Sequence, residues 1–300
     1  MKFWVATAFM DTRQLVPIAR LLDEAGYHGV LMSDHLFYPR DLSSRYPYSP
    51  NPDGSPIWDP ETAWPESFVM IGAMAAVTTN LHFTNNIYVA GHRPILQVAK
   101  EVGTAAVISD NRVALGVAAG WMREEFDLQG QDYANRGKRL NEMIPALREL
   151  WKGGWVEWHG EHYDIPPMML EPHPSEPVPI YCGGHTDAAL RRAAKYCDGW
   201  IGNAYPLAEC ANYVDKIKGY LREYGRDDVP FEFIVGVYAM PSPDTYKRAE
   251  DIGITGTMCV PWAMDQNISK GDRSGLLQAA EAYRPSIEQF ATDIVAHCQT

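Results

Sequence analysis

A histidine directly after a short apolar run is the first residue whose position suggests chemistry. Residues 29–33 read Gly-Val-Leu-Met-Ser, and Asp34 and His35 come next. An imidazole can take up or release a proton near neutral pH, so a histidine at the end of a strand is a candidate general acid or base. The same position also suits a histidine that only caps a strand or packs beneath a loop.

A pair of glycines marks the second candidate position. Gly183, Gly184, His185 and Thr186 link an apolar run at 179–182 to a helical pattern. Glycine lets a ligand approach the backbone closely, and the free N–H groups of a helix N-terminus favour an anion. Thr186 adds a hydroxyl donor. We interpret this turn as a phosphate site, with an ordinary turn as the alternative.

Two asparagines interrupt a third apolar run. Asn85 and Asn86 lie within residues 81–89, where a buried parallel strand is normally apolar throughout. Because a buried amide without a partner is costly, their side chains are candidates to hydrogen-bond a polar ring. The alternative is a strand bulge in which backbone groups satisfy the amides.

Small residues end a fourth run, at 112–118. Ala119 and Gly120 follow it and leave room for something flat, and Trp121 comes next. The indole of Trp121 could form one wall of that space, and it would suit a core position equally well. We therefore include all three residues among the candidates for cofactor contact.

Several common sites are not indicated. Residues 159–162 read His-Gly-Glu-His, but they lack the helical spacing of a zinc site and have no third ligand nearby, so we expect no metal. The chain has no Gly-x-Gly-x-x-Gly after its first strand, no P-loop and no Gly-x-Ser-x-Gly. A net charge of -12 without a Lys/Arg run argues against nucleic acid and anionic membranes as partners.

Alternating strands and helices must position these residues. Repeated strand–helix units in a chain of 300 residues favour one α/β domain over 1–300, a (β/α)8 TIM barrel rather than an open sheet. Strands are expected at 3–8, 29–33, 81–89, 112–118, 179–182, 199–202, 231–239 and 256–260. Helices are expected between Asp11 and Gly26, at 67–78, 94–108, 135–151, 186–196, 206–224 and 243–252, and after Ser274. Asp11 and Gln14 have the spacing of a capping box.

Two segments extend the repeat. Residues 36–66 form a long proline-rich connection after the second strand, and we predict a lid over the end of the barrel where barrel enzymes have their active sites. Its aromatic side chains argue against disorder and predict a substrate cover: Tyr38, Tyr46, Tyr48, Trp58 and Trp64. Residues 155–167 are predicted to form a β-hairpin between the fourth and fifth strands, turning at His159-Gly160.

The composition of the chain indicates the cellular compartment in which the protein is expected. No run approaches the ~20 apolar residues of a membrane helix, and the first ten residues lack a signal-peptide cleavage pattern, so we expect a cytoplasmic protein. The five scattered cysteines fit a reducing compartment. The helix predicted at 67–78 is apolar on nearly all sides, which favours burial in a homodimer interface.

Several segments together resemble the bacterial luciferase-like monooxygenase superfamily. Each segment is short, but their order and spacing extend over most of the chain. They are 29–35 (GVLMSDH), 92–94 (HRP), 111–121 (NRVALGVAAGW), 125–126 (EF), 136–139 (RGKR), 183–184 (GG) and 198–200 (DGW). Ser33-Asp34-His35 and Glu124-Glu125-Phe126 are most similar to the branch that uses the deazaflavin coenzyme F420.

The resemblance implies a barrel whose mouth holds the cofactor ring against a bulge in the third strand. That bulge often contains a non-prolyl cis peptide bond, here expected within residues 85–87. His35 matches the family's histidine, and Gly183-Gly184 matches its phosphate loop. The predicted cofactor contacts are Asp34, Asn85, Asn86, Ala119, Gly120, Trp121, Gly183, Gly184, His185 and Thr186.

Two departures narrow the expected reaction. Ala119 stands near the place of a phosphate-binding arginine in the luciferases. Trp121 occupies the place of a catalytic glutamate in the sugar-phosphate deazaflavin dehydrogenases. Neither the luciferase reaction nor the sugar-phosphate reaction is therefore expected of this chain.

Three functions are consistent with the resemblance. The first is an F420-dependent oxidoreductase that transfers a hydride to or from a small apolar organic substrate, with His35 handling the proton and the lid excluding water. The second is an FMN-dependent monooxygenase that uses reduced flavin and oxygen. In both cases a flavin or F420 reductase is a possible partner. The third is a flavin-binding protein without turnover.

Overall fold

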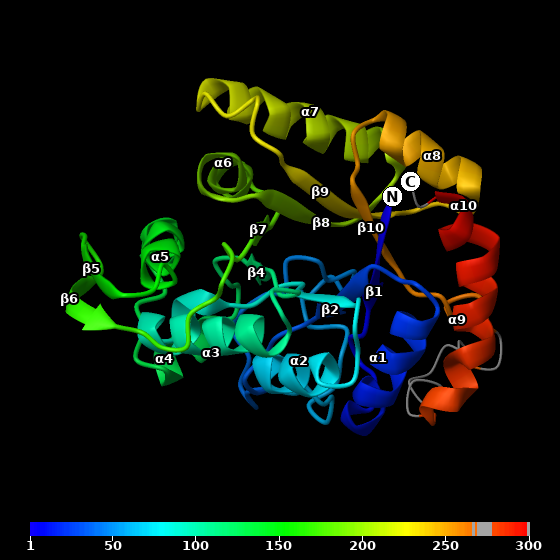
Figure 1. Cartoon of the computed structure of the whole chain (residues 1–300), viewed down its shortest axis with the longest axis horizontal. Coiled ribbons are helices and arrows are strands. Elements are labelled where there is room, and N and C mark those ends of the chain that lie inside the picture. The colour runs from blue at the N-terminus through cyan, green and yellow to red at the C-terminus, as the bar shows by residue number, and fades with distance from the viewer. Residues whose placement is uncertain (266–267, 269–277, 299–300) are drawn as a thin grey trace.

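The computed structural model describes residues 1–265, 268 and 278–298. Within them, eight parallel strands form one sheet in the order β3-β2-β1-β10-β9-β8-β7-β4. Parallel bridges between Phe83 and Val113 and between Tyr88 and Val117 connect the two edges of this sheet. The sheet is therefore a nearly closed barrel surrounded by helices (Figure 1), which confirms the predicted (β/α)8 TIM barrel.

The elements follow one another as strand and helix around the barrel. The barrel strands are β1 (Lys2–Ala6), β2 (Gly29–Met32), β3 (His82–Asn85), β4 (Leu115–Val117), β7 (Ile180–Gly183), β8 (Gly199–Tyr205), β9 (Glu232–Val237) and β10 (Gly256–Cys259). The helices are α1 (Leu15–Glu24), α2 (Ser67–Ala75), α3 (Ile95–Ile108), α4 (Arg123–Leu128), α5 (Arg136–Leu150), α6 (Asp187–Tyr196), α7 (Leu207–Glu223), α8 (Pro243–Asp251), α9 (Arg284–Phe290) and α10 (Ala296–Cys298). The predicted start of the last barrel helix, near Ser274, lies outside the described residues.

The barrel strands are buried on both faces, as expected of a parallel sheet. Trp4, Leu31, Tyr181, Ile201 and Ile234 pack together in a separate cluster inside the barrel. Alternate residues of the same strands face outward and join the larger core beneath the helices. This double burial explains the short β-branched and apolar runs from which the strands were predicted.

The third strand is shorter than predicted because the chain changes its partner near Asn86. The N–H of Asn86 still donates to Met32 of β2, whereas the N–H of Tyr88 donates to Gly116 of β4. The peptide bond between Asn86 and Ile87 is cis, within the range that the resemblance indicates. Gly116 permits the close approach, since a Cβ there would lie 1.9 Å from the carbonyl oxygen of Asn85.

The predicted capping box at the first helix is wrong. Asp11 caps the 3-10 helix Thr12–Gln14 by accepting from the N–H of Arg13, and α1 begins only at Leu15. The side-chain oxygen of Gln14 instead accepts from the N–H of Ala280. The spacing Asp-x-x-Gln therefore serves a tertiary contact with the C-terminal part of the chain.

The insertion after β4 contains an antiparallel hairpin of β5 (Trp155–His159) and β6 (Asp164–Met169). It extends away from the barrel next to α5 (Figure 1). The second strand begins later than predicted. The N–H groups of His162 and Tyr163 lie in the turn and donate to the carboxylate of Glu142 on α5. These hydrogen bonds hold the turn against the barrel's outer layer.

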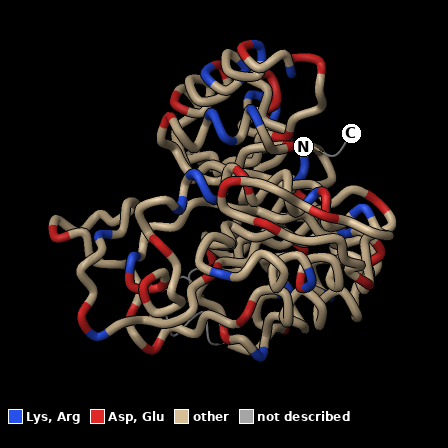
Figure 2. The backbone as a smooth tube through the Cα atoms, turned by 90° about the vertical axis from the view of Figure 1, so that its left-hand side faces the viewer, with Lys and Arg blue, Asp and Glu red and all other residues tan. Residues whose placement is uncertain are grey.

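Helix α2 buries Phe68, Ile71 and Met74 and leaves Val69 70% exposed. The homodimer expected through this helix stays a prediction. Lys and Arg are interspersed with Asp and Glu in Figure 2. Among the described residues, no helix combines the length and apolar character needed to span a bilayer.

Two histidines stack at the N-terminal end of the barrel and give the fold an expected sensitivity to acid. The rings of His28 and His82 are 4.6 Å apart and nearly parallel. Burial, then the neighbouring His82 and Lys2, lowers the pKa of His28 to about 3. Burial, then Arg112, also lowers the pKa of His82.

The unfolded chain therefore binds more protons than the folded chain below the ordinary histidine pKa of about 6.5. The stabilisation is complete above that pH and is lost as the pH falls toward the folded-state pKa. We expect the free energy of unfolding in urea to fall by up to about 1.4 kcal/mol per pH unit for each histidine. His28→Phe should flatten this slope, whereas His297→Gln, at an exposed position, should keep it. Equal slopes in the wild type and His28→Phe would contradict the assignment.

Candidate active site

The C-terminal ends of the parallel strands bring the two main candidates to one rim of the barrel. Asp34 and His35 follow the end of β2, and Gly184 and His185 follow the end of β7. The lid, residues 36–66, connects the two sides. Its Tyr48 hydroxyl lies 3.2 Å from Nδ1 of His185, and its Trp58 ring packs on His35.

Aromatic rings surround the imidazole of His35. Its ring centroid lies 5.0 Å from Trp58, 5.2 Å from Trp64 and 5.7 Å from Trp121. Tyr46 extends the cluster, with its ring 4.9 Å from Trp58 and 5.2 Å from Trp121. These contacts leave the His35 side chain 9% exposed. The surroundings are thus apolar and nearly dry, as suits an apolar substrate.

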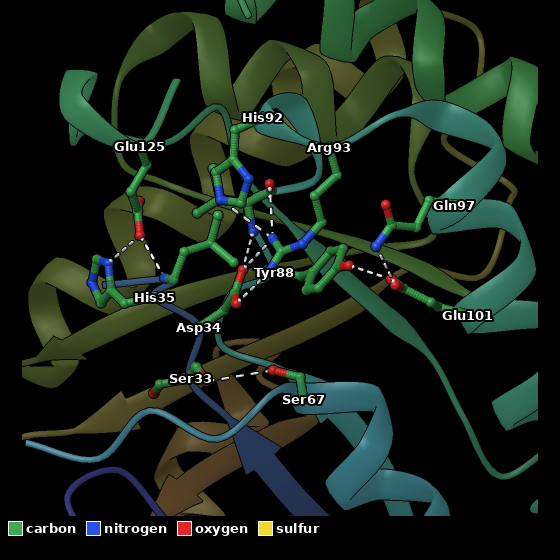
Figure 3. A network of polar contacts seen from close by, with 12 residues as sticks. Ser33, Asp34, His35, Ser67, Tyr88, His92, Arg93, Gln97, Glu101 and Glu125 are labelled. Carbon is green, nitrogen blue, oxygen red and sulfur yellow. Dashed lines mark hydrogen bonds and ion pairs between the residues drawn. The ribbon is translucent and has the colours of Figure 1, made fainter. Parts of the chain in front are cut away.

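The imidazole has a buried carboxylate behind it. Nδ1 of His35 lies 3.2 Å from Oε1 of Glu125 on α4, and the N–H of Leu36 donates to the same oxygen at 2.8 Å. Figure 3 shows both contacts. A carboxylate only accepts hydrogen bonds, so Nδ1 carries the hydrogen in this contact. Among the described residues, Nε2 of His35 has no hydrogen-bond partner and is the nitrogen free to act on a substrate.

Asp34 has a structural partner instead. The guanidinium of Arg93 contacts both carboxylate oxygens at 2.8 Å, and the N–H of Val89 donates to one of them at 2.9 Å (Figure 3). Arg93 also lies 4.0 Å above the ring of Tyr88. The hydrogen bond from Val89 ties Asp34 to the segment that follows the cis peptide bond. The predicted contact of Asp34 with a cofactor stays a prediction.

A second carboxylate of α4 binds the lid. Oε1 of Glu124 accepts hydrogen bonds from the N–H and hydroxyl of Ser43, both at 2.7 Å, and from the N–H of Ser44 at 3.1 Å. Burial raises the pKa of Glu124, but the hydrogen bonds from the two serines outweigh this and lower it to about 2. The charged carboxylate therefore anchors the lid across the whole physiological pH range.

The turn after β7 has local geometry that favours glycine at both positions. Gly184 has a φ of +104°, which L side chains rarely adopt, and a Cβ at Gly183 would lie 2.7 Å from the Ile87 side chain. Thr186 caps α6 by accepting from the N–H of Ala189, so its hydroxyl oxygen is already used as an acceptor. Backbone N–H groups at the start of α6 favour an anion at this end of the helix.

The two asparagines that were predicted to contact the cofactor lie on opposite faces of the barrel wall. Asn86 is partly exposed, and its amide lies 3.1 Å from the Met258 sulfur inside the barrel. Asn85 is fully buried, and no side-chain amide atom of Asn85 has a partner among the described residues. Its register partner is Met32, which faces the helix layer, so the two asparagines face opposite sides.

The residues after β4 form one side of the mouth. Ala119 and Gly120 are partly buried, and a Cβ at Gly120 would lie 2.5 Å from the Val89 side chain. Tyr38 is half-buried, and no ring contact joins it to the His35 cluster within the described part of the chain. Sequence reasoning quoted Glu125 and Arg93 within motifs but gave neither a role. Their partners, His35 and Asp34, lie far away in the sequence.

The cavity at the lid is much smaller than the cavity at the opposite end of the barrel. Next to Trp64 and Phe9 a cavity of about 10 Å³ remains, far smaller than a typical ligand pocket of about 300–1,000 Å³. A cavity of about 320 Å³ lies at the opposite end, between Trp4, His28 and His82. No group of three or more His, Cys, Asp or Glu suited to a metal occurs in the described ranges.

The family model described as luciferase-like monooxygenase matches residues 4–298. The chain belongs to this family. Members of the luciferase-like family are oxidoreductases or monooxygenases. A relative from Mycobacterium bovis, named only as an uncharacterised protein, is 35% identical, with 99% of each chain covered. A pyrimidine monooxygenase, RutA of Variovorax paradoxus, is 32% identical over 44% of this chain and 37% of its own length.

Solved structures share the luciferase-like barrel. An F420-dependent secondary alcohol dehydrogenase in complex with an F420–acetone adduct superimposes with a TM-score of 0.74 at 14% identity, covering 100% of both chains. The F420-dependent tetrahydromethanopterin reductase of Methanopyrus kandleri gives 0.73 at 13% identity and 99% coverage of both chains. The monooxygenase RslO1 of Streptomyces bottropensis gives 0.70 at 16% identity and 100% coverage of both. At these identities the likeness concerns the fold.

Proposed function

We propose that this protein is an F420-dependent oxidoreductase that transfers a hydride to or from a small apolar organic substrate. The observation that supports this most is the contact between His35 and Glu125 at the lid. Ser33-Asp34-His35 and Glu124-Glu125-Phe126 resemble the deazaflavin branch separately in the sequence, and they meet in the fold. A proton-carrying imidazole in an apolar enclosure suits a reaction that couples hydride and proton transfer.

The residues at the mouth fit such a cofactor. The turn at Gly183-Gly184 and the start of α6 would hold its phosphate, and Asn86 would lie beside its ring. The indole N–H of Trp64 is buried without a partner among the described residues, so a ligand in the mouth could accept from it. When bound, the deazaflavin would supply a ring carbon that exchanges hydride with the substrate.

The chain itself would manage the proton and the solvent. Nε2 of His35 would take the proton from a substrate hydroxyl during oxidation, or return it to a carbonyl oxygen during reduction. Trp58, Trp64 and Trp121 would exclude water around these atoms. Because these rings fill the mouth in the described structure, the lid must move aside before the cofactor or substrate can enter.

An FMN-dependent monooxygenase is the second candidate. RutA and RslO1 carry the name monooxygenase, and the aromatic lid would equally protect an oxygen-sensitive reaction from water. On this alternative, reduced FMN would bind at the same glycine turn. The choice between the two functions therefore depends on the cofactor.

Titration of the protein with each cofactor tests the choice between F420 and FMN directly. We expect F420 to bind with a lower dissociation constant than FMN when each is titrated and followed by absorbance and tryptophan fluorescence. Gly184→Ala should weaken F420 binding by about tenfold or more, since it disturbs the phosphate turn. Gly253→Ala is the matched control, because Gly253 also has a positive φ, +98°, but lies after α8. Tight FMN binding without F420 binding would overturn the proposal.

A further inference from the structure

Glu125 is a buried carboxylate whose contacts all concern the catalytic candidate and the start of the lid. It lies on the short helix α4, and its side chain is 1% exposed. Oε1 receives the hydrogen on Nδ1 of His35 and the N–H of Leu36, the first residue of the lid. A single oxygen atom therefore connects the imidazole with the first residue of the segment that carries Trp58 and Trp64.

Among the described groups near Glu125, His35 is the one that can carry a positive charge beside it. Arg93 is paired with Asp34, and no lysine or arginine side chain pairs with Glu125 among the described residues. His92 is also near, but burial, then Arg93, lowers its pKa to about 4, so it is neutral at pH 7. The neighbouring Glu124 is negative. A positive charge beside Glu125 therefore arises when His35 takes up a proton.

We propose that Glu125 is a positioning residue that fixes His35 in the tautomer with hydrogen on Nδ1. This leaves Nε2 as the atom that exchanges protons with a ligand, and the inference rests on the proposed function only for what that ligand is. When Nε2 gains a proton, the contact becomes an ion pair between imidazolium and carboxylate. Both atoms are nearly dry, so this charge-assisted bond is stronger than in water. The hydrogen bond to Leu36 keeps the lid in register with the imidazole.

The test compares Glu125→Gln with Glu124→Gln, two isosteric changes at adjacent positions of the same helix. The first removes the charge beside His35, and the second removes the charge that holds Ser43 and Ser44. Imidazole ¹⁵N shifts, assigned to His35 by its loss in His35→Ala, report the tautomer directly and need no cofactor. We expect the Nδ1–H pattern in the wild type and in Glu124→Gln, and a mixture of tautomers in Glu125→Gln.

Kinetics provide the second readout. Because Glu125→Gln alters the nitrogen that carries the hydrogen and not the walls of the site, it should lower kcat by about tenfold or more and change the substrate KM little. Glu125→Asp, which keeps a carboxylate acceptor, should retain more of the wild-type kcat than Glu125→Gln. Circular dichroism and thermal unfolding identify variants that do not fold. If Glu125→Gln does not fold, the tautomer and the kinetics are measured on Glu125→Asp alone.

The two readouts separate failure of this inference from failure of the proposed function. An unchanged His35 tautomer and an unchanged kcat in folded Glu125→Gln would overturn the positioning role, whichever cofactor binds. A changed tautomer in a protein that binds FMN and not F420 would support Glu125 while rejecting the proposed function.

Discussion

Replacing His35 with alanine is expected to lower kcat by about 10²–10⁴-fold, the usual contribution of a positioned acid or base. The reason is geometric: Nε2 of His35 is free, the ring is enclosed by indoles, and Glu125 holds the opposite nitrogen. The measurement is steady-state turnover with F420, with a substrate found by screening small alcohols and carbonyl compounds. Binding of the cofactor should change little, since the proposed phosphate turn follows β7 whereas His35 follows β2.

The combination of lost turnover and retained binding distinguishes an enzyme that uses His35 from a flavin-binding protein without turnover. If His35→Ala binds F420 and turns over at the wild-type rate, the imidazole is not catalytic. If neither protein turns over any substrate but both bind a flavin, the non-catalytic alternative is favoured. His297→Gln is a suitable control, because it removes an exposed histidine from the C-terminal helical segment.

Replacing Arg93 with alanine is expected to reduce the free energy of unfolding by about 3–5 kcal/mol, because it leaves the carboxylate of Asp34 buried without its partner. Both side chains are nearly inaccessible, at 6% for Arg93 and 2% for Asp34. The double variant Asp34→Leu/Arg93→Met should recover much of the loss, since it removes both charges together. Urea unfolding at pH 7.5 measures both.

A surface ion pair provides the comparison for this prediction. Arg284 contacts Glu281 and Glu288 near solvent, and its side chain is 38% exposed. Arg284→Ala should therefore leave the free energy of unfolding almost unchanged. A similar small cost for Arg93→Ala would mean that Asp34 is solvated or protonated in that variant, and it would contradict the structural role assigned to the pair.

The periodic parts of the fold were predictable because they depend on local patterns. Short apolar runs and amphipathic stripes located the barrel strands and most of the helices, to within a few residues at their ends. The third strand was predicted too long because its continuation pairs with β4, and no local pattern records a change of partner. The pair Asp11 and Gln14 shows the same limit, since Gln14 contacts Ala280 rather than its own helix.

The site was predictable in its location and less so in its contacts. The end of β2, the glycine turn and the aromatic lid could each be recognised from residue type and position. The pairs His35–Glu125 and Asp34–Arg93 could not, because they connect segments 90 and 59 positions apart. Such contacts depend on how loops pack over the barrel rim, which a single sequence does not encode by spacing.

The fluorescence of the tryptophans around His35 can also report movement of the lid. Trp58 and Trp64 belong to the lid, residues 36–66, whereas Trp121 belongs to the barrel rim. The rings of Trp58 and Trp121 are 6.2 Å apart. Any movement that parts them alters the polarity around each chromophore. Emission spectra recorded in a stopped-flow instrument can therefore time the entry of ligands without an added dye.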